Sequence, residues 1–393
     1  AAASPAVFAF AWTACSIAPF MDRRPGEGTA LKRYPMIALA VSCIFLLGGF
    51  AVLCSPSPGL SGWLGSWSSL ADLDHGSGMV AFALLMLAVV SRKGLFPLHG
   101  WVVKAHESGS LPTSALLING HLAAFLALRV VIPVLPGAAG SALILITDIA
   151  LLTALYAGLL ALSETAPRRI FALLSVSQSS FVLAGLETGT PEGVSGALVY
   201  WMVVTIATTA IAIVLQSIEQ RTQSLGSDVS FLGLAGAFPR LATFFVVCGV
   251  ALVGMPGTLG FIADELLLHG ALESHPRLGL VMPIAAALNA FHLYRLFSRL
   301  FLGSKGPTLS GVPDARLSER LALTAALALL IVGGLMPARA VGLRSAAADA
   351  IVHRLLPRRR GGAGMLGTGR STTGASRADA SEVQRRPPGF LQH

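Results

Sequence analysis

Two adjacent carboxylic acids inside a long apolar segment are the residues best placed to do chemistry. Asp264 and Glu265 follow the helix-breaking pair Pro256 and Gly257 in the stretch GMPGTLGFIADELLLHG. Proline removes a helical hydrogen bond, and the freed carbonyl groups must find partners within protein or in a wet cavity. A charge within a membrane is costly, and broken helices with ionisable groups nearby recur at transporter ion sites. These residues therefore predict a buried acidic site.

Ionisable residues interrupt several other apolar segments. Arg92 and Lys93 end one segment just before GLFPLHGW, and His121 lies within another beside Asn119. By spacing alone, Arg92 and Lys93 fit two interpretations equally well. They are either functional residues within the bundle or residues at the end of a span whose charged groups extend to the membrane surface. His121 also fits as a neutral histidine bonded to a neighbouring carbonyl. The remaining positions of this kind are Asp148, His292 and Arg295.

The segments that carry these residues are long and apolar enough to cross a membrane. The chain has 393 residues, of which 54% are hydrophobic and 12% are charged, whereas soluble domains average about 25% charged residues. A membrane-spanning helix needs about 20 mostly apolar residues. The sequence thus predicts an all-α polytopic bundle of about ten spans, with at least one helix broken by Pro and Gly. The expected spans are residues 5–21, 35–54, 76–96, 113–135, 141–163, 168–187, 195–217, 241–269, 278–301 and 320–337.

Loop charges predict the orientation of the bundle. Loops rich in Lys and Arg alternate with neutral or acidic loops, which places the basic loops in the cytoplasm and the N-terminus outside. We expect residues 1–337 to form the transmembrane domain. The next segment, residues 338–356, forms a surface helix unless one span is miscounted. Residues 357–393 have the composition of a basic disordered tail.

Composition also excludes several functions. The net charge of +9 does not indicate nucleic-acid binding, because the basic residues lie in short loops and in a tail without interleaved aromatic residues. The four cysteines lack metal-ligand spacing. The chain has no glycine fingerprint for a dinucleotide, no cysteine set for an iron–sulfur cluster and no haem attachment motif. We therefore expect it to bind no cofactor or metal and to have no active site of its own.

Three stretches of the chain are similar to those of a known membrane-protein family. GLFPLHGWVVKAHESGSLPTSALL resembles FPLHxWLPDAHEGAPTPVSALL, RRIFALLSVSQSSFVLAGL resembles KRLLAYSSISxxGYxxxGL, and LVGMPGTLGFIADELLL resembles LxGxPGTxGFxxEFLL. The family comprises the antiporter-like subunits of respiratory complex I (chains L, M and N of NADH-quinone oxidoreductase) and of Mrp cation/proton antiporters. The resemblance covers roughly residues 5–303. It implies a bundle of about fourteen helices with inverted repeats, each containing a broken helix, and a buried Lys/His/Glu proton relay, with the family's first helices preceding residue 1.

The resemblance carries over at some positions and fails at others. Arg92 or Lys93 matches the lysine before FPLH: Arg92 has the better spacing from Pro97, but only Lys93 could readily lose its proton. Asp264, with Glu265 beside it, matches the acid of the second broken helix. The family's ionisable residues are missing at three expected positions, which are occupied by Thr13, Ala124 and Thr208.

A proton path would therefore depend on fewer ionisable groups than the family pattern implies. It would run through Lys93, His121 and bound waters to Asp264 and Glu265. Serine, threonine and glutamine can hold such waters but cannot store a proton. The candidates for holding the waters are Ser175, Ser177, Gln178, Thr205 and Thr208.

The resemblance implies an ion-translocating, most simply proton-translocating, membrane subunit of a complex-I-like or Mrp-like assembly. Redox chemistry with NADH and quinone would belong to partner subunits, and the expected location is a bacterial inner membrane. Two alternatives stay open. One is the membrane subunit of an inorganic-carbon uptake complex, and the other is a scaffold that no longer pumps.

Overall fold

The fold is a bundle of apolar helices, seen in a computed structural model of the chain. The structure describes residues 4–21, 29–56, 59–67, 73–120, 122–186, 188, 190–222, 233–274, 276–303, 312–342, 345 and 348, and these residues contain no strand. His121 and residues 349–393 lie outside the described residues, so the expected surface helix and tail are not described beyond a short helical stretch at residues 337–342.

Long apolar runs form long helices. The helices are α1 (Pro5–Met21), α2 (Thr29–Leu53), α3 (Leu60–Leu64), α4 (His75–Lys93), α5 (Gly100–Ser108), α6 (Leu111–Asn119), α7 (Leu122–Leu126), α8 (Ile132–Val134), α9 (Pro136–Ser163), α10 (Pro167–Leu186), α11 (Pro191–Thr222), α12 (Pro239–Leu252), α13 (Leu259–Ser274), α14 (Pro276–Phe301) and α15 (Leu317–Leu335). Within the described residues, eight helical runs are long and apolar enough to cross a membrane, and two shorter apolar helices lie at Pro5–Ile17 and Pro239–Leu252. The all-α polytopic prediction is confirmed.

Two helices are broken, and the sequence prediction located only one of the breaks. The expected span 241–269 is divided into α12 and α13, and Pro256 and Gly257 lie in the turn between them. The second break follows α4, whose chain turns at Gly94 and continues as α5. Gly94 has a φ of 61°, which favours glycine. Residues 100–108, expected to be a loop, are therefore half of a discontinuous helix.

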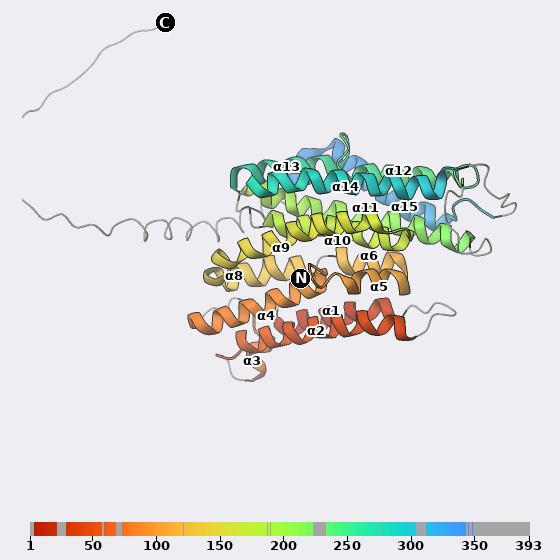
Figure 1. Cartoon of the computed structure of the whole chain (residues 1–393). Coiled ribbons are helices and arrows are strands. Elements are labelled where there is room, and N and C mark those ends of the chain that lie inside the picture. Colours follow the sequence, from red (N-terminus) through yellow and green to blue (C-terminus); the bar gives the residue numbers. More distant parts are fainter. Residues whose placement is uncertain are drawn as a thin grey trace, which may run out of the picture.

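The helices pack side by side in the order of the sequence (Figure 1). One side is formed by α1, α2 and α4, and the other by α12–α15. Between them lie α10 and α11, which pack against each other and contact helices from both halves: α10 packs on α5, α6, α9 and α14, and α11 on α6, α12, α13 and α15. Helix α10 is the most buried, with 94% of its apolar window inside the bundle. The polar residues of α10 and α11 are thus held away from lipid.

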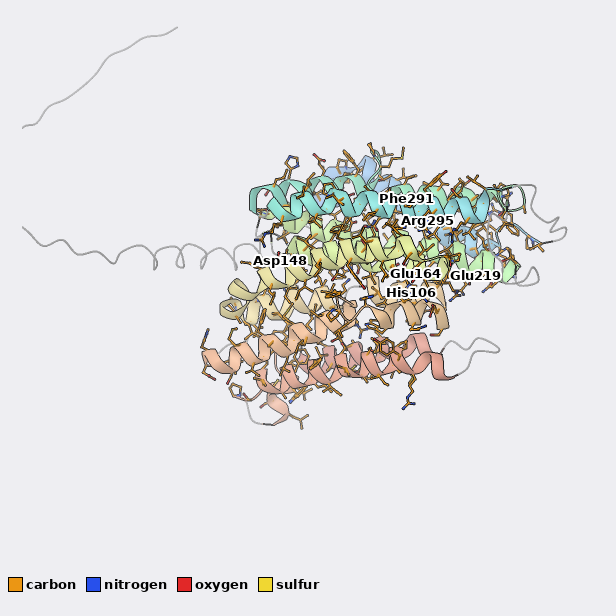
Figure 2. The ribbon with its side chains drawn as sticks, viewed as in Figure 1. His106, Asp148, Glu164, Glu219, Phe291 and Arg295 are labelled. Carbon is orange, nitrogen blue, oxygen red and sulfur yellow. The ribbon has the colours of Figure 1, made fainter. Side chains whose placement is uncertain are left out.

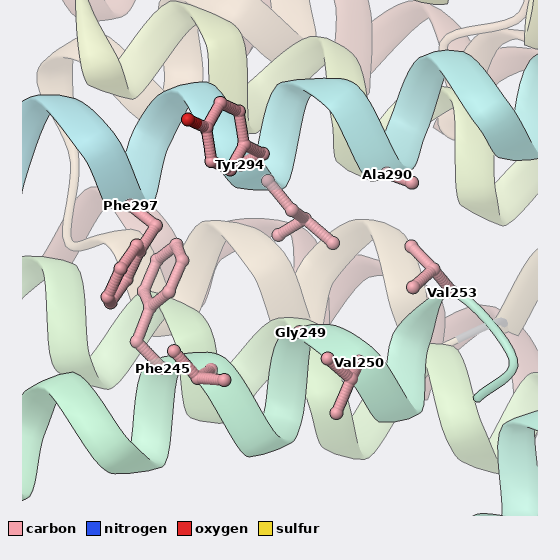
Figure 3. A pocket seen from close by; sticks show the side chains of 9 residues that line it. Phe245, Gly249, Val250, Val253, Ala290, Tyr294 and Phe297 are labelled. Carbon is pink, nitrogen blue, oxygen red and sulfur yellow. The ribbon is translucent and has the colours of Figure 1, made fainter. Parts of the chain in front are cut away.

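The outer surface of the bundle is apolar over wide areas. An open groove of about 370 Å³ between α12 and α14 is lined by Phe245, Val246, Gly249, Val250, Val253, Ala290, Leu293, Tyr294 and Phe297 (Figure 3). On α15 only 11% of the apolar window is buried. Surfaces of this kind suit contact with lipid chains or other membrane helices.

Candidate functional site

Arg92 and Lys93, at the end of α4, point into different parts of the bundle. The buried Arg92 guanidinium donates to the Trp12 carbonyl oxygen at 3.2 Å and to Ser16 Oγ at 2.6 Å, and lies 4.4 Å from the centre of the Trp12 ring. Lys93 is 1% exposed, and its Nζ donates to the Ile118 carbonyl oxygen at 3.2 Å. Arg92 therefore binds α1, while Lys93 reaches α6.

This geometry decides between the two candidates for the relay lysine. Arginine stays protonated in proteins, so Arg92 cannot pass a proton on. Arg92 is not a snorkelling residue either, because it is 2% exposed. Thr13, at the position where the family has an acid, is exposed, and its hydroxyl bonds its own helix at the Ala9 carbonyl (2.9 Å). Lys93 is thus the group at this break that can exchange a proton.

The C-terminal end of α6 joins the lysine to α11. Asn119 follows the Ile118 carbonyl that Lys93 contacts, and Asn119 Nδ2 donates to Thr208 Oγ1 at 2.7 Å. Thr205 Oγ1 donates to the Asn119 carbonyl at 2.6 Å. Thr208, where a lysine is expected, thus acts as a hydrogen-bond partner. The other position without a lysine, Ala124, is fully buried in apolar surroundings.

The polar residues of α10 do not form one file. Gln178 Oε1 accepts a hydrogen bond from the Tyr200 hydroxyl on α11. Ser177, the preceding residue, faces the other way: its hydroxyl donates to the Ala154 carbonyl at 2.9 Å and accepts from Asn289 Nδ2 at 2.9 Å. Ser177 and Gln178 therefore have partners on different helices, as expected for neighbouring helical residues that point about 100° apart, and their role in holding waters stays a prediction.

Unpartnered polar atoms mark where this region could hold water. Ser175 Oγ, Asn119 Oδ1 and Asn289 Oδ1 are buried and make no hydrogen bond to protein. Buried polar atoms in proteins normally have a partner, and ordered water is the usual one when protein supplies none. Asn119 lies on α6, Ser175 on α10 and Asn289 on α14. The chemistry of these atoms therefore fits waters held at separate points within the bundle.

At the second break, the side chains of Asp264 and Glu265 lie in different surroundings. The Asp264 carboxylate packs against Gly254, whose φ of +73° favours glycine, and it fills the space that a Cβ on that glycine would need. Asp264 also lies within electrostatic range of Tyr200. Glu265, by contrast, has a side chain that is 52% exposed and pairs with His269 at 3.5 Å. The expectation of two acids buried together is therefore wrong: Asp264 is partly buried against Gly254, and Glu265 is exposed.

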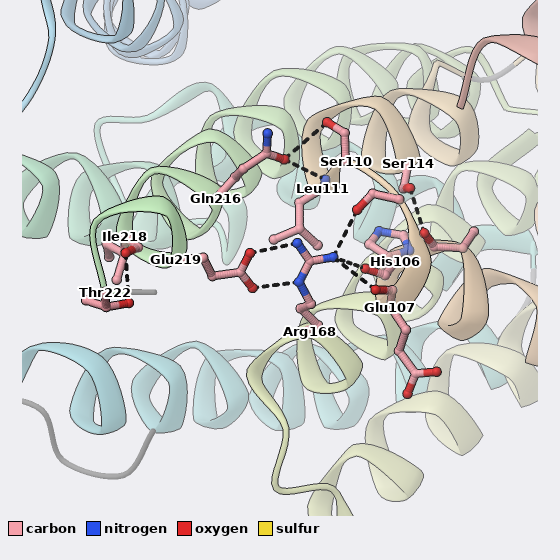
Figure 4. A network of polar contacts seen from close by, with 12 residues as sticks. His106, Glu107, Ser110, Leu111, Ser114, Arg168, Gln216, Ile218, Glu219 and Thr222 are labelled. Atoms are coloured by element: carbon pink, nitrogen blue, oxygen red, sulfur yellow. Dashed lines mark hydrogen bonds and ion pairs between the residues drawn. The ribbon is translucent and has the colours of Figure 1, made fainter. Parts of the chain in front are cut away.

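A second polar network, which the sequence did not reveal, holds the turn between α5 and α6 (Figure 4). Arg168 on α10 binds both Glu219 carboxylate oxygens at 2.6 Å, and also donates to the carbonyl oxygens of His106 and Gly109 at the end of α5. Gln216 Oε1 on α11 accepts from Leu111 N at 2.8 Å. From the sequence, Arg168 was one of the basic residues expected in a cytoplasmic loop. The sequence did not indicate that it pairs with Glu219.

A cavity lies beside the first break, at the end of the bundle where Glu164 and Glu219 gather (Figure 2). It has a volume of about 360 Å³ and contains His99, whose Nδ1 is buried without a protein partner. Its lining residues are Tyr34, His99, Gly100, Val103, Lys104, Leu160, Glu164, Arg169 and Leu173. The cavity is therefore lined by several titratable groups, among them His99, Lys104 and Glu164. The described residues contain no cluster of three metal-ligating side chains.

Comparison with known proteins identifies the family. The pattern of the NADH:quinone oxidoreductase/Mrp antiporter transmembrane family matches residues 20–289. The chain belongs to this family. NADH-quinone oxidoreductase subunit M of Rickettsia bellii (strain RML369-C) is 27% identical over 258 residues, covering 64% of this chain and 52% of the relative. NADH-quinone oxidoreductase subunit 13 of Thermus thermophilus is 30% identical over 252 residues, covering 63% and 52%.

Solved structures confirm the antiporter-like fold. A chain of respiratory complex I from Thermus thermophilus with bound NADH superposes with a TM-score of 0.78 at 24% identity, covering 90% of this chain and 76% of that one. A chain of the Mrp complex from Dietzia sp. DQ12-45-1b gives 0.68 at 21% identity, covering 90% and 71%. The chain spans about half the length of the curated relatives it matches. It is an integral membrane member of the antiporter-like family whose ionisable residues depart from the family pattern.

Proposed function

We propose that this chain translocates protons as one subunit of a multi-subunit membrane complex. The supporting observation is a series of polar groups between the two broken helices. Lys93 donates to the Ile118 carbonyl, and the next residue, Asn119, donates to Thr208 on α11. Tyr200, on the same helix, lies within electrostatic range of Asp264.

Each end of this series has a group that can exchange a proton. An amine and a carboxylate both gain and lose protons, whereas the hydroxyl and amide groups between them can only order water. Tyr200 and Thr208 are eight residues apart on α11, which corresponds to about 12 Å along the helix. That distance exceeds a single proton transfer, so transfer requires waters held by Asn119 Oδ1 and Ser175 Oγ. The cavity beside His99 would supply protons to the Lys93 end.

The partners follow from the same proposal. The complex would have other membrane subunits, and any reaction with NADH or quinone would take place in those subunits. This chain would bind no cofactor, and its location would be a bacterial inner membrane. We favour protons over Na⁺ because this series of polar groups contains one lysine and one carboxylate. A hard cation such as Na⁺ would prefer several oxygen ligands.

The test is proton flux in inverted vesicles that contain the assembled complex. We expect Asp264→Asn and Lys93→Met to lower the flux by on the order of 10²-fold, with the amount of complex unchanged on native gels. Asp148→Asn is the matched control, because Asp148 is an exposed acid, 43% accessible, that pairs with Arg277 at 3.4 Å and lies outside this series of polar groups. Wild-type flux in both variants, or no flux in the wild type, would refute the proposal and favour a scaffold.

A further inference from the structure

One outward stripe of α13 carries polar groups where a lipid-facing helix has none. Phe261, Glu265, His269 and Leu272 recur at intervals of four, four and three residues, which places them on one face. Their exposed fractions are 39% for Phe261, 52% for Glu265, 69% for His269 and 59% for Leu272. The opposite face of α13 is buried against α11. The stripe is thus the uncovered side of a helix that packs on the bundle by its other side.

Glu265 lies well inside α13. It is nine residues from the end of the helix at Ser274, about 13 Å at 1.5 Å per residue. Since α13 is half of a broken helix in an integral membrane chain, and a hydrocarbon core is about 30 Å thick, we place Glu265 within that core. An ionised carboxylate that faces lipid is strongly unfavourable. His269, one turn nearer the end, lies 3.5 Å from the carboxylate and supplies one partner.

Other uncovered faces of the bundle show what contact with lipid requires. Beyond its first turn, which exposes Ser318 and Arg320, the outward residues of α15 are apolar except Thr324. Leu321, Leu329, Val332 and Leu335 are all more than half exposed. The groove between α12 and α14 is likewise lined by apolar groups. The stripe on α13 differs from these faces because a carboxylate and an imidazole lie between its two apolar ends.

We propose that the α13 stripe is the docking face for a transmembrane helix of a neighbouring subunit, which places a Lys or Arg side chain opposite Glu265. A cation satisfies the remaining lone pairs of the carboxylate and removes its charge from contact with lipid. Phe261 and Leu272 provide apolar contacts above and below the pair. The proposal rests on the proposed membership of a multi-subunit complex, but it requires no proton flux.

The docking face also adjoins the candidate relay. Glu265 follows Asp264 directly, so the residue that would face the partner and the residue that packs against Gly254 share one turn of α13. A cation held beside Glu265 would be a fixed charge close to the exchangeable group. The partner helix would therefore be in a position to influence the relay from outside this chain.

Photo-crosslinking in native membranes tests the proposal. A photoreactive phenylalanine analogue replaces Phe261 in the full complex, and the crosslinked peptide is identified by mass spectrometry. We expect an adduct with a membrane helix of another subunit of the complex that carries Lys or Arg. The same analogue at Leu329 on α15 is the control and should give no such adduct. Phe261 adducts with lipid only, or with a helix that has no basic residue, would overturn the proposal.

Charge reversal then tests the pairing itself. Glu265→Lys should lower recovery of the crosslinked partner subunit with this chain by at least about tenfold, because two like charges would meet at the interface. Changing the partner's basic residue to Glu in the same complex should restore recovery. Unchanged recovery in Glu265→Lys would overturn the proposal. Recovery of the partner subunit is measured without any measurement of proton flux. Failure of the docking proposal can therefore be distinguished from failure of the proton-translocation proposal.

Discussion

Two glycines in one helix break allow the role of Asp264 to be separated from backbone strain. Gly254 and Gly257 both have positive φ, +73° and +88°. Alanine in this region costs about 1–2 kcal/mol in either position. The two sites differ in their surroundings: a Cβ on Gly254 would collide with the Asp264 carboxylate, whereas a Cβ on Gly257 meets nothing within 4 Å. Gly254→Ala must therefore move Asp264, and Gly257→Ala need not.

The expected result follows from that difference. Gly257→Ala should lose about 1–2 kcal/mol of stability, and Gly254→Ala should lose more, because its Cβ also displaces the Asp264 carboxylate. Gly254→Ala should in addition reduce proton flux, because a shift of about 1 Å at a reacting group can cost about 10²-fold in rate. Gly257→Ala should keep a flux close to that of the wild type.

Inverted vesicles energised by the complex, with flux normalised to the amount of complex, provide the assay, and thermal unfolding of the purified complex checks stability. Equal flux in the two variants would refute the reasoning, because it would mean that the position of Asp264 against the break does not matter. A loss of flux in both variants, accompanied by loss of the complex, would show instead that the turn is needed for folding.

Three further outcomes are expected. Lys93→Arg keeps the charge but cannot release a proton, so flux should fall as far as in Lys93→Met; flux retained in the arginine variant would show that only charge matters. Thr208→Val leaves the Asn119 amide without its partner, which costs about 1–3 kcal/mol and should lower flux, whereas Thr208→Ser should restore both; equal behaviour of valine and serine contradicts this role. Hydrogen bonding from Ser77, and then from Gly76, lowers the pKa of Asp74 at the start of α4, so this cap stabilises the helix above the carboxyl's ordinary pKa and is lost as pH falls through the lowered value. Amide exchange in the first turn of α4 should therefore quicken in acid, and Asp74→Ala should abolish that change.

The helices could be predicted from sequence because length alone identifies a span, and most apolar runs of about 20 residues form one helix. The runs 113–135 and 241–269 are the exceptions, since each is divided into shorter helices. Which way a residue faces could not be predicted. The spans are apolar on all sides, so they carry no periodic pattern that would orient them. Asp264 and Glu265 illustrate this: the run surrounding them is equally apolar on either face, yet one points inward and the other outward.

Short polar helices were missed for a related reason. Helix α5 has nine residues, among them Lys104, His106 and Glu107, and such a composition is typical of a loop. Its helical form depends on partners distant in the sequence, since Arg168 binds the carbonyls at its end. The pairing of Arg168 with Glu219 joins residues 51 positions apart, and a single sequence does not record such contacts.

The guanidinium of Arg92 limits which residues the proposed proton path can include. It is bonded to Trp12 and Ser16 on α1, and it can neither give up a proton nor leave its position without losing those bonds. The hydrogen bond of Lys93 leads instead to α6, and from there to α11. In the proposed path, protons would therefore reach and leave Lys93 without passing through Arg92, and a subunit beyond α1 would influence this chain by its charge and not by proton exchange through Arg92.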